Sequence, residues 1–285
     1  MKIIVYIPDS NDEHVDTLTA FSKGCDCEIR SIHSYKPSDL AVIFGIGKKN
    51  VPESYPRGNV LYKQKMNGAK TIVIEKGYIK RDKYYSVGFD NLNGRADFNI
   101  SKMPSDRWDM LGVELKPYRD ISEGKYLLLC GQVPSDASVQ YIDINKWYMD
   151  MVARIKSIDD IPILFRPHPL AIDRTPHIEG TVWSDGTQEE DFEHATAVIT
   201  FNSNTGVDAL IEGIPVYSHD EGSMVYGVSS HQIDRIVHFD RTQWANDIAY
   251  TQWTREEMEQ GLPLEHLLNG NFDIQRASDS RFKLA

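Results

Sequence analysis

Two polar runs in the second half of the chain carry residue types suited to binding phosphate. One run holds Arg166 and His168, each followed by a proline, directly after the apolar residues Ile163–Phe165. The other is Ser203-Asn204-Thr205, which follows the apolar residues Ala197–Phe201 and opens a helical pattern. Such a turn leaves backbone N–H groups free, adds hydroxyls and meets the positive end of the helix dipole. The two runs together predict a phosphate or nucleotide site, whereas the turn alone would predict an ordinary N-cap.

A carboxylate in the first half has the position of a general base. Glu75 ends the apolar run Thr71–Glu75, and ligands of an open α/β sheet bind beyond the carboxyl ends of its strands. Such a carboxylate can take a proton from an acceptor hydroxyl or act as a nucleophile. Asp90, in a loop rich in glycine and asparagine, is the second candidate. The competing interpretation is a surface salt bridge between Glu75 and one of three nearby cations, Lys76, Lys80 and Arg81.

Three more polar residues are candidates on the phosphate-binding side. Asp208 and Glu212 follow Thr205 in the helical pattern, where their carboxylates would bind ribose hydroxyls, although Asp208 also fits an ordinary first-turn acid. Gln132 stands just after the apolar run Tyr126–Cys130. No Asp-x-Asp pair stands near these residues in the sequence, so we expect the chemistry to be metal-independent.

Apolar runs alternating with helical patterns must position these residues, and they predict an α/β fold with two Rossmann-like domains facing a cleft. In the first half the expected strands are Lys2–Ile7, Cys27–Ile32, Leu40–Ile46, Thr71–Glu75 and Tyr84–Phe89, with helices over Asp12–Lys23 and Asn59–Asn67. In the second half the expected strands are Tyr126–Cys130, Ile163–Phe165, Ala197–Phe201 and Ile214–Tyr217, with a helix over Gln140–Ser157 whose aromatic and methionine stripe faces the core. We expect domains over residues 1–120 and 121–240. Residues 241–285 would add a helix over Arg241–Trp253, a second helix starting at Thr254, and a tail.

Composition narrows the class of protein. The 285 residues carry a net charge of −11, which argues against a broad nucleic-acid-binding face. No apolar run approaches the roughly 20 residues that cross a bilayer, and the N-terminus lacks the features of a signal peptide. The three cysteines have no zinc-site spacing, so free thiols in a reducing cytoplasm are expected. The sequence predicts no particular oligomeric state.

Four segments, taken together, resemble a known family. Glu75–Asp82 looks like the Glu-x-Gly-Tyr-x-Arg-Pro segment of capsular polysaccharide synthesis and export proteins, which include β-Kdo transferases. The Arg-Pro-His-Pro run at Arg166 resembles the His-Pro motif of that family, and Phe201–Val216 resembles its Ser-x-x-Gly-x-Glu-Ala-Leu-x-x-Gly-x-Pro-Val segment. Residues 244–261 resemble its C-terminal Ala-Tyr-x-Gln-Trp-Thr pattern. The chain departs from the family where Lys80-Arg81 replaces Arg-Pro and where Asp208 replaces Glu.

The resemblance implies a GT-B-type glycosyltransferase with the donor on the C-terminal domain and the acceptor on the N-terminal one. The co-substrate would be a CMP- or UDP-linked sugar, with no other cofactor, and the acceptor side would include Lys76, Tyr78, Lys80 and Arg81. The short chain is like compact members found in phage genomes, so a glycan and a hydroxymethylated pyrimidine of phage DNA are both open as acceptors. A nucleotide-sugar epimerase or hydrolase of the same fold, and a non-catalytic nucleotide-sugar-binding module, remain alternatives.

Overall fold

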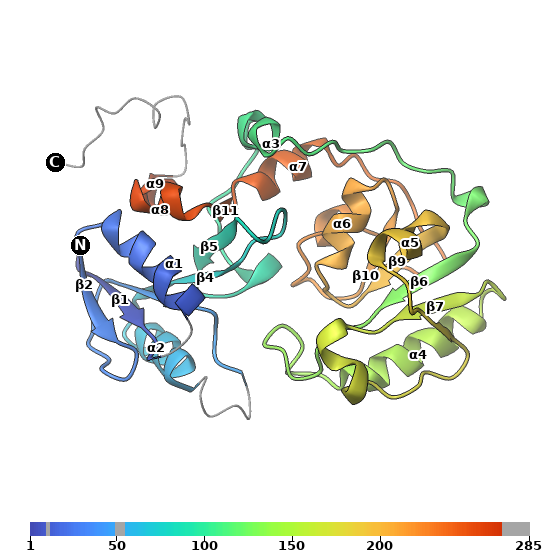
Figure 1. Cartoon of the computed structure of the whole chain (residues 1–285), viewed down its shortest axis with the longest axis horizontal. Coiled ribbons are helices and arrows are strands. Elements are labelled where there is room, and N and C mark those ends of the chain that lie inside the picture. The colour runs from blue at the N-terminus through green and yellow to red at the C-terminus, as the bar shows by residue number, and fades with distance from the viewer. Residues whose placement is uncertain (10–11, 49–54, 270–285) are drawn as a thin grey trace. The chain divides into compact units, whose positions relative to one another are not determined.

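The computed structural model describes residues 1–9, 12–48 and 55–269, which form two compact units (Figure 1). Unit 1 comprises Met1–Leu92, Ala96–Gly112 and the described chain from Thr242 onward. Unit 2 comprises Asn93–Arg95 and Val113–Arg241. The helices that follow Thr242 therefore belong to the same compact unit as the N-terminal strands. None of the helices within these ranges is both long and apolar enough to span a membrane.

Unit 1 is built on a mixed six-stranded sheet with the order β11-β5-β4-β3-β1-β2. The strands are β1 (Ile3–Ile7), β2 (Cys27–Ser31), β3 (Leu40–Phe44), β4 (Lys70–Lys76), β5 (Tyr85–Phe89) and β11 (Gln252–Trp253). The first four strands run parallel, whereas β5 is antiparallel to β4 and β11 is antiparallel to β5. The carboxyl ends of β1, β3 and β4 consequently share one edge, and β5 ends at the opposite edge.

Helices cover both faces of this sheet because the buried strands present apolar side chains on both sides. Alternate residues of β1 show the division: Val5 packs with Leu18 and Phe21 of α1 (Asp12–Lys23), whereas Ile4 packs with Val60 of α2 (Tyr55–Met66). Side chains of successive strand residues point to opposite faces, so each strand contributes to two core clusters. The cluster on the α1 face also includes Met258 of α8 and Leu264 of α9.

The predicted helix over Arg241–Trp253 is wrong after Ala249. The chain forms α7 (Thr242–Ala249), then the short strand β11, then α8 (Arg255–Glu259) and α9 (Leu262–Asn269), and α3 (Asp106–Leu111) completes the unit. Tertiary contacts override the helical pattern because Trp253 is fully buried, with the Arg107 guanidinium 3.9 Å from its ring centre. The predicted helix start at Thr254 is confirmed, since its side chain forms a capping box with Glu257.

Unit 2 is built on a parallel five-stranded sheet with the order β10-β9-β6-β7-β8. The strands are β6 (Tyr126–Cys130), β7 (Ile163–Arg166), β8 (Val182–Trp183), β9 (Ala195–Thr200) and β10 (Val216–Ser218), and the helices are α4 (Ile144–Lys156), α5 (Gln188–Glu193) and α6 (Thr205–Ile211). The aromatic and methionine stripe of α4 lies in the core with Leu129 and Phe165, as its periodicity predicts.

Each sheet reverses its winding direction once, and the predicted α/β fold with two Rossmann-like domains is confirmed. In unit 1 the chain passes from β1 to β2 on one side and then continues with β3 and β4 on the other. In unit 2 it passes from β6 to β7 and β8, then returns to β9 on the other side of β6. The carboxyl edge between β1 and β3, and that between β6 and β9, are therefore the places where such sheets bind ligands.

Candidate functional site

The reversal point of unit 2 is organised by two facing amides. Gln132, just after β6, donates from Nε2 to Oδ1 of Asn202 at 2.7 Å, and the Asn202 backbone N–H donates to Gln132 Oε1 at 3.0 Å. Both side chains are buried, and the Gln132 backbone N–H donates to the Tyr148 hydroxyl at 2.6 Å. Because both amide atoms of Gln132 are used within the protein, its structural role is to hold the segment after β9 in place.

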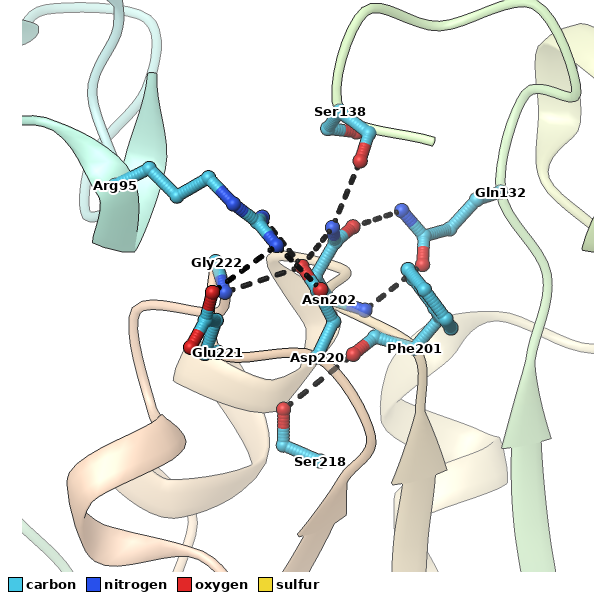
Figure 2. A network of polar contacts seen from close by, with 9 residues as sticks. All are labelled: Arg95, Gln132, Ser138, Phe201, Asn202, Ser218, Asp220, Glu221 and Gly222. Atoms are coloured by element: carbon cyan, nitrogen blue, oxygen red, sulfur yellow. Dashed lines mark hydrogen bonds and ion pairs between the residues drawn. The ribbon is translucent and has the colours of Figure 1, made fainter. Parts of the chain in front are cut away.

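Asn202 continues this network to a buried carboxylate, as Figure 2 shows. Its Nδ2 donates to the Ser138 carbonyl and to Asp220 Oδ2, both at 2.9 Å. Arg95 donates to the two oxygens of Asp220 at 2.7 Å each, and the Gly222 N–H donates to Oδ2 at 3.1 Å. The sequence pattern did not single out Asn202, Asp220 or Arg95. No local signal marks them, because Arg95 and Asp220 lie 125 residues apart in the sequence.

The predicted phosphate turn lies beside this network, at the start of α6. Asn204 is the N-cap residue of the helix, and the Ser203 backbone N–H donates to Thr200 Oγ1 at 2.8 Å. The hydroxyls of Ser203 and Thr205 lie 3.2 Å apart, and the Thr205 N–H donates to Ser203 Oγ at 3.3 Å. The turn therefore brings two hydroxyls and the first backbone N–H groups of a helix to the carboxyl edge of the sheet, the arrangement that the sequence predicted.

Arg166 is the last residue of β7, and its guanidinium forms an ion pair with a carboxylate. Its Nη1 donates to Asp191 Oδ2 at 2.6 Å and to the Gly186 carbonyl at 2.8 Å. The Asp191 side chain is buried and also accepts from Ser184 Oγ. The positive charge that the sequence predicts for this strand end is thus balanced by Asp191, a partner that sequence spacing does not reveal.

His168 lies two residues further on and has a defined tautomer. Its Nδ1 accepts a hydrogen bond from the Leu170 N–H at 3.1 Å, so the proton of the neutral ring is on Nε2. The loop that carries His168 packs closely against Gly131, just after β6. A Cβ on Gly131 would lie 3.0 Å from both the Arg166 carbonyl oxygen and the His168 backbone nitrogen. Gly131 therefore allows the Arg-Pro-His-Pro run and the Gln132 segment to meet at the same edge.

The two carboxylates proposed for ribose binding lie at different ends of α6. Asp208, in the first turn, accepts from Gln188 Nε2 at 3.0 Å. Glu212 is the C-cap residue and pairs with Lys116 at 2.6 Å and with Arg119 at 3.7 Å. The structure therefore does not bring Glu212 to the phosphate turn, because a helix of seven residues separates them.

In unit 1 the carboxyl edge of the sheet carries Glu75, as predicted. Glu75 is partly buried near the end of β4, and the Lys76 N–H donates to its Oε1 at 3.0 Å. Gly45 directly follows β3, has φ of +67° and leaves room for two side chains. A Cβ on Gly45 would lie 3.1 Å from Arg57 Nη1 and 3.2 Å from Glu75 Oε2. Arg57, from the first turn of α2, is a site residue that the sequence pattern did not indicate.

Helix α1 adds an acid and an imidazole to this edge. Glu13 forms an ion pair with Lys76 and accepts from the Tyr85 hydroxyl at 3.0 Å, and the Lys76 cation keeps the pKa of Glu13 below its usual value. The His14 ring stacks on Phe44 with ring centres 3.9 Å apart. Burial, together with the nearby Arg57 charge, lowers the pKa of His14 to about 4, so its imidazole is neutral at pH 7.

Asp90 does not join Glu75. β5 runs antiparallel to β4, with Ser86 beside Glu75 and Phe89 beside Ile72, so Asp90 lies at the opposite edge of the sheet. There it adopts φ of +64° and exchanges two hydrogen bonds with Thr71, its own N–H donating at 2.7 Å and its Oδ1 accepting at 2.8 Å. Asp90 closes the turn after β5. The sequence predicted the strand but carried no signal for its direction.

Of the four residues expected on the acceptor side, three make contacts within the protein and one is exposed. Lys76 pairs with Glu13, and Tyr78 is buried with its ring against Phe98. Lys80 has φ of +49° and donates to the Leu111 carbonyl. Arg81 is exposed.

The turn after Glu75 is held by the C-terminal motif. Gln252 Oε1 accepts from the N–H groups of Tyr78 and Ile79 at 2.8 and 3.0 Å, and its Nε2 donates to the Ile79 carbonyl at 3.1 Å. A Cβ on Gly77 would lie 2.9 Å from Gln252 Oε1, which explains the glycine. Two segments that resemble one family, more than 170 residues apart, thus contact each other within unit 1.

Among residues 1–9, 12–48 and 55–269, no three His, Cys, Asp or Glu side chains gather as a metal site would require. The described edges instead offer hydroxyls, backbone N–H groups, cations and a carboxylate.

Searches of sequence and structure give different results. No protein-family model matches the sequence, and no curated protein matches it. Among solved structures, a Thermosulfurimonas dismutans KpsC β-Kdo 2,7 transferase is similar with a TM-score of 0.58 and 15% identity, over 94% of this chain and 100% of that one. A KpsC β-Kdo 2,4 transferase from the same organism is similar with a TM-score of 0.59 and 12% identity, over 89% of this chain and 92% of that one.

These two similarities concern the fold. They extend over nearly the whole of each chain, so both Rossmann-like units take part. This chain therefore has the fold of the KpsC β-Kdo transferase structures. The likeness agrees with the resemblance that the four sequence segments indicate.

Proposed function

We propose that this protein is a glycosyltransferase that moves a sugar from a nucleotide-sugar donor to an acceptor hydroxyl. The observation that carries the proposal is the likeness to two KpsC β-Kdo transferases over nearly the full length of the chain. The residues at the carboxyl edges of the two sheets support it, because they supply what the reaction needs. One edge has hydroxyls and an imidazole of the kind that bind phosphate, and the other has a partly buried carboxylate.

The donor's phosphate would bind to unit 2. The Ser203 and Thr205 hydroxyls and the N–H groups at the start of α6 would hold its oxygens. His168, through Nε2, would neutralise charge that builds on the leaving phosphate. The Arg166–Asp191 pair would keep the loop that carries His168 in place. Gln132 and Asn202 would act indirectly, by fixing the position of the turn.

Glu75 would carry out the chemistry on the acceptor side, as a base or as a nucleophile. Its position beyond a central strand of unit 1 and its partial burial support this role. We also propose a CMP- or UDP-linked donor, metal-independent transfer in the cytoplasm, and an acceptor that is either a glycan or a hydroxymethylated pyrimidine of phage DNA. The net charge of −11 favours the glycan.

A thermal-shift experiment tests the donor site. CMP, UDP and GDP are added to the wild type, to His168→Ala and to His33→Ala, an exposed histidine of unit 1 that serves as control. A nucleotide at about 100 times its dissociation constant stabilises the folded protein by about 2.7 kcal/mol. We expect CMP or UDP to raise the melting temperature of the wild type and of His33→Ala, and to have a much smaller effect on His168→Ala.

His168 is a better probe than Arg166, because removing Arg166 would leave the buried Asp191 charge without its partner and would destabilise the fold. No shift with any nucleotide would refute the proposed donor site. If a nucleotide binds, the corresponding nucleotide sugars are then incubated with and without acceptor. Consumption of the sugar nucleotide without any acceptor would indicate an epimerase or hydrolase instead of a transferase.

A further inference from the structure

Arg57 and Glu75 converge above Gly45. Arg57 comes from the first turn of α2, is partly buried, and donates from Nη1 to the Phe44 carbonyl at 3.3 Å. The point where a Gly45 Cβ would stand is 3.1 Å from Arg57 Nη1 and 3.2 Å from Glu75 Oε2. These two contacts place a guanidinium nitrogen and a carboxylate oxygen within roughly 6 Å of each other. Any residue other than glycine at position 45 would put a side chain between them.

Among the described residues, three more titratable groups lie at this edge: Glu13, His14 and Lys76. Lys76 pairs with Glu13, which also accepts from Tyr85. His14 is neutral at pH 7 because burial lowers its pKa to about 4. The carboxylate that acts on Arg57 is Glu75, whose charge partly offsets the lowering of the Arg57 pKa by burial. Arg57 and Glu75 are thus two opposite charges that lie close enough to act on each other.

We propose that Arg57 is a positioning residue that keeps the Glu75 carboxylate ionised and directed over Gly45. An opposite charge at this distance favours the ionised carboxylate over the protonated one. Since only the ionised form can accept a proton or attack a sugar carbon, Arg57 would extend the activity of Glu75 toward lower pH. The catalytic meaning of this inference rests on the proposed function, but the charge coupling can be measured without any substrate.

The direct test is a carboxyl titration by NMR. Protein labelled with glutamate carrying ¹³C at the side-chain carboxyl is titrated with acid, and the Glu75 signal is identified as the one missing from Glu75→Gln. We expect the midpoint of the Glu75 signal to rise by about one to two pH units in Arg57→Met. Lys65→Met, which removes an exposed cation from the same helix, should leave the midpoint unchanged.

Two more variants keep the result interpretable. Arg57→Lys preserves the charge and should keep the midpoint close to that of the wild type. Arg57→Gln, which is also neutral but polar, replaces the Met variant if that protein does not fold. An unchanged midpoint in the folded Arg57→Met or Arg57→Gln protein overturns the inference, and so does an equal shift in Lys65→Met. Failure of the proposed function would appear elsewhere, as an absence of sugar transfer by the wild type, and failure of the role proposed for Glu75 would appear as full transfer activity in Glu75→Gln.

Discussion

Acidification should destabilise the protein through one buried histidine, His266 of α9. The ring is fully buried, its Nε2 donates to the Phe98 carbonyl at 3.0 Å, and Trp253 and Tyr250 lie within 5.6 Å between ring centres. Burial lowers the pKa of His266 from its ordinary value of 6.5 to about 4. The folded protein therefore holds the imidazole neutral at a pH where the unfolded chain already binds a proton.

The sign and size follow from proton linkage. A base whose pKa is lower in the folded state contributes full stability above the unfolded value of 6.5, and this is lost as the pH falls toward the folded value of about 4. Between pH 8 and pH 5, the unfolded chain takes up nearly a full proton at this site and the folded protein takes up almost none. The free energy of unfolding should then fall by about 2 kcal/mol because of His266 alone.

Urea unfolding at pH 8, 7, 6 and 5 measures this loss in the wild type and in His266→Gln. The variant should be less stable than the wild type at pH 8, but it should lose about 2 kcal/mol less between pH 8 and pH 5. His14, whose pKa is also lowered to about 4, is present in both proteins, so the difference isolates His266. His177→Gln, at an exposed histidine, should follow the wild type. Equal losses in wild type and His266→Gln would refute the reasoning.

Two further predictions concern the carboxylates and the turn of unit 1. In a sugar-transfer assay Asp90→Asn should keep full activity, since asparagine tolerates the positive φ of +64°. Glu75→Gln should lose about 100-fold or more of the transfer rate. Loss of activity in both variants would restore Asp90 as a catalytic candidate. Gly77→Ala should lower the melting temperature by several degrees, because its Cβ would lie 2.7 Å from the Tyr84 carbonyl oxygen. Gly227→Ala has no atom within 4 Å of the new Cβ and should melt like the wild type; equal melting of both alanine variants would contradict the close contact at Gly77.

The sequence alone predicted most of the strands and the polar residues at two strand ends. Buried parallel strands appear as short apolar runs, which is why β3, β6 and β9 lie close to their predicted positions. The Ser203–Thr205 turn could be placed at a helix start because hydroxyl and amide residues between a strand and a helix are a local signal. Glu75 was placed near the end of β4 for the same reason, since the run of apolar residues ends there.

Tertiary structure alone decided strand direction and the partners of the charged residues. Asp90, the second candidate, lies at the edge opposite Glu75 because β5 pairs antiparallel with β4 and β11, and this direction depends on those contacts and not on the residues of β5 themselves. Trp253 lies in a strand and not in the predicted helix, because its burial next to Arg107 outweighs helical periodicity. In both cases a weak local preference is overridden by packing between distant segments.

The sequence by itself determined most of the strands, their order and the residue types at their ends, because those depend on interactions between near neighbours in the chain. The fold alone brought Arg57 to Glu75 and Asp191 to Arg166, and it placed Asn202 between Gln132 and Asp220. These partners lie 18 to 70 residues apart. No periodicity or spacing encodes such pairs, since the attraction between charges and amides depends on distance in space, which only the packed sheets and helices define.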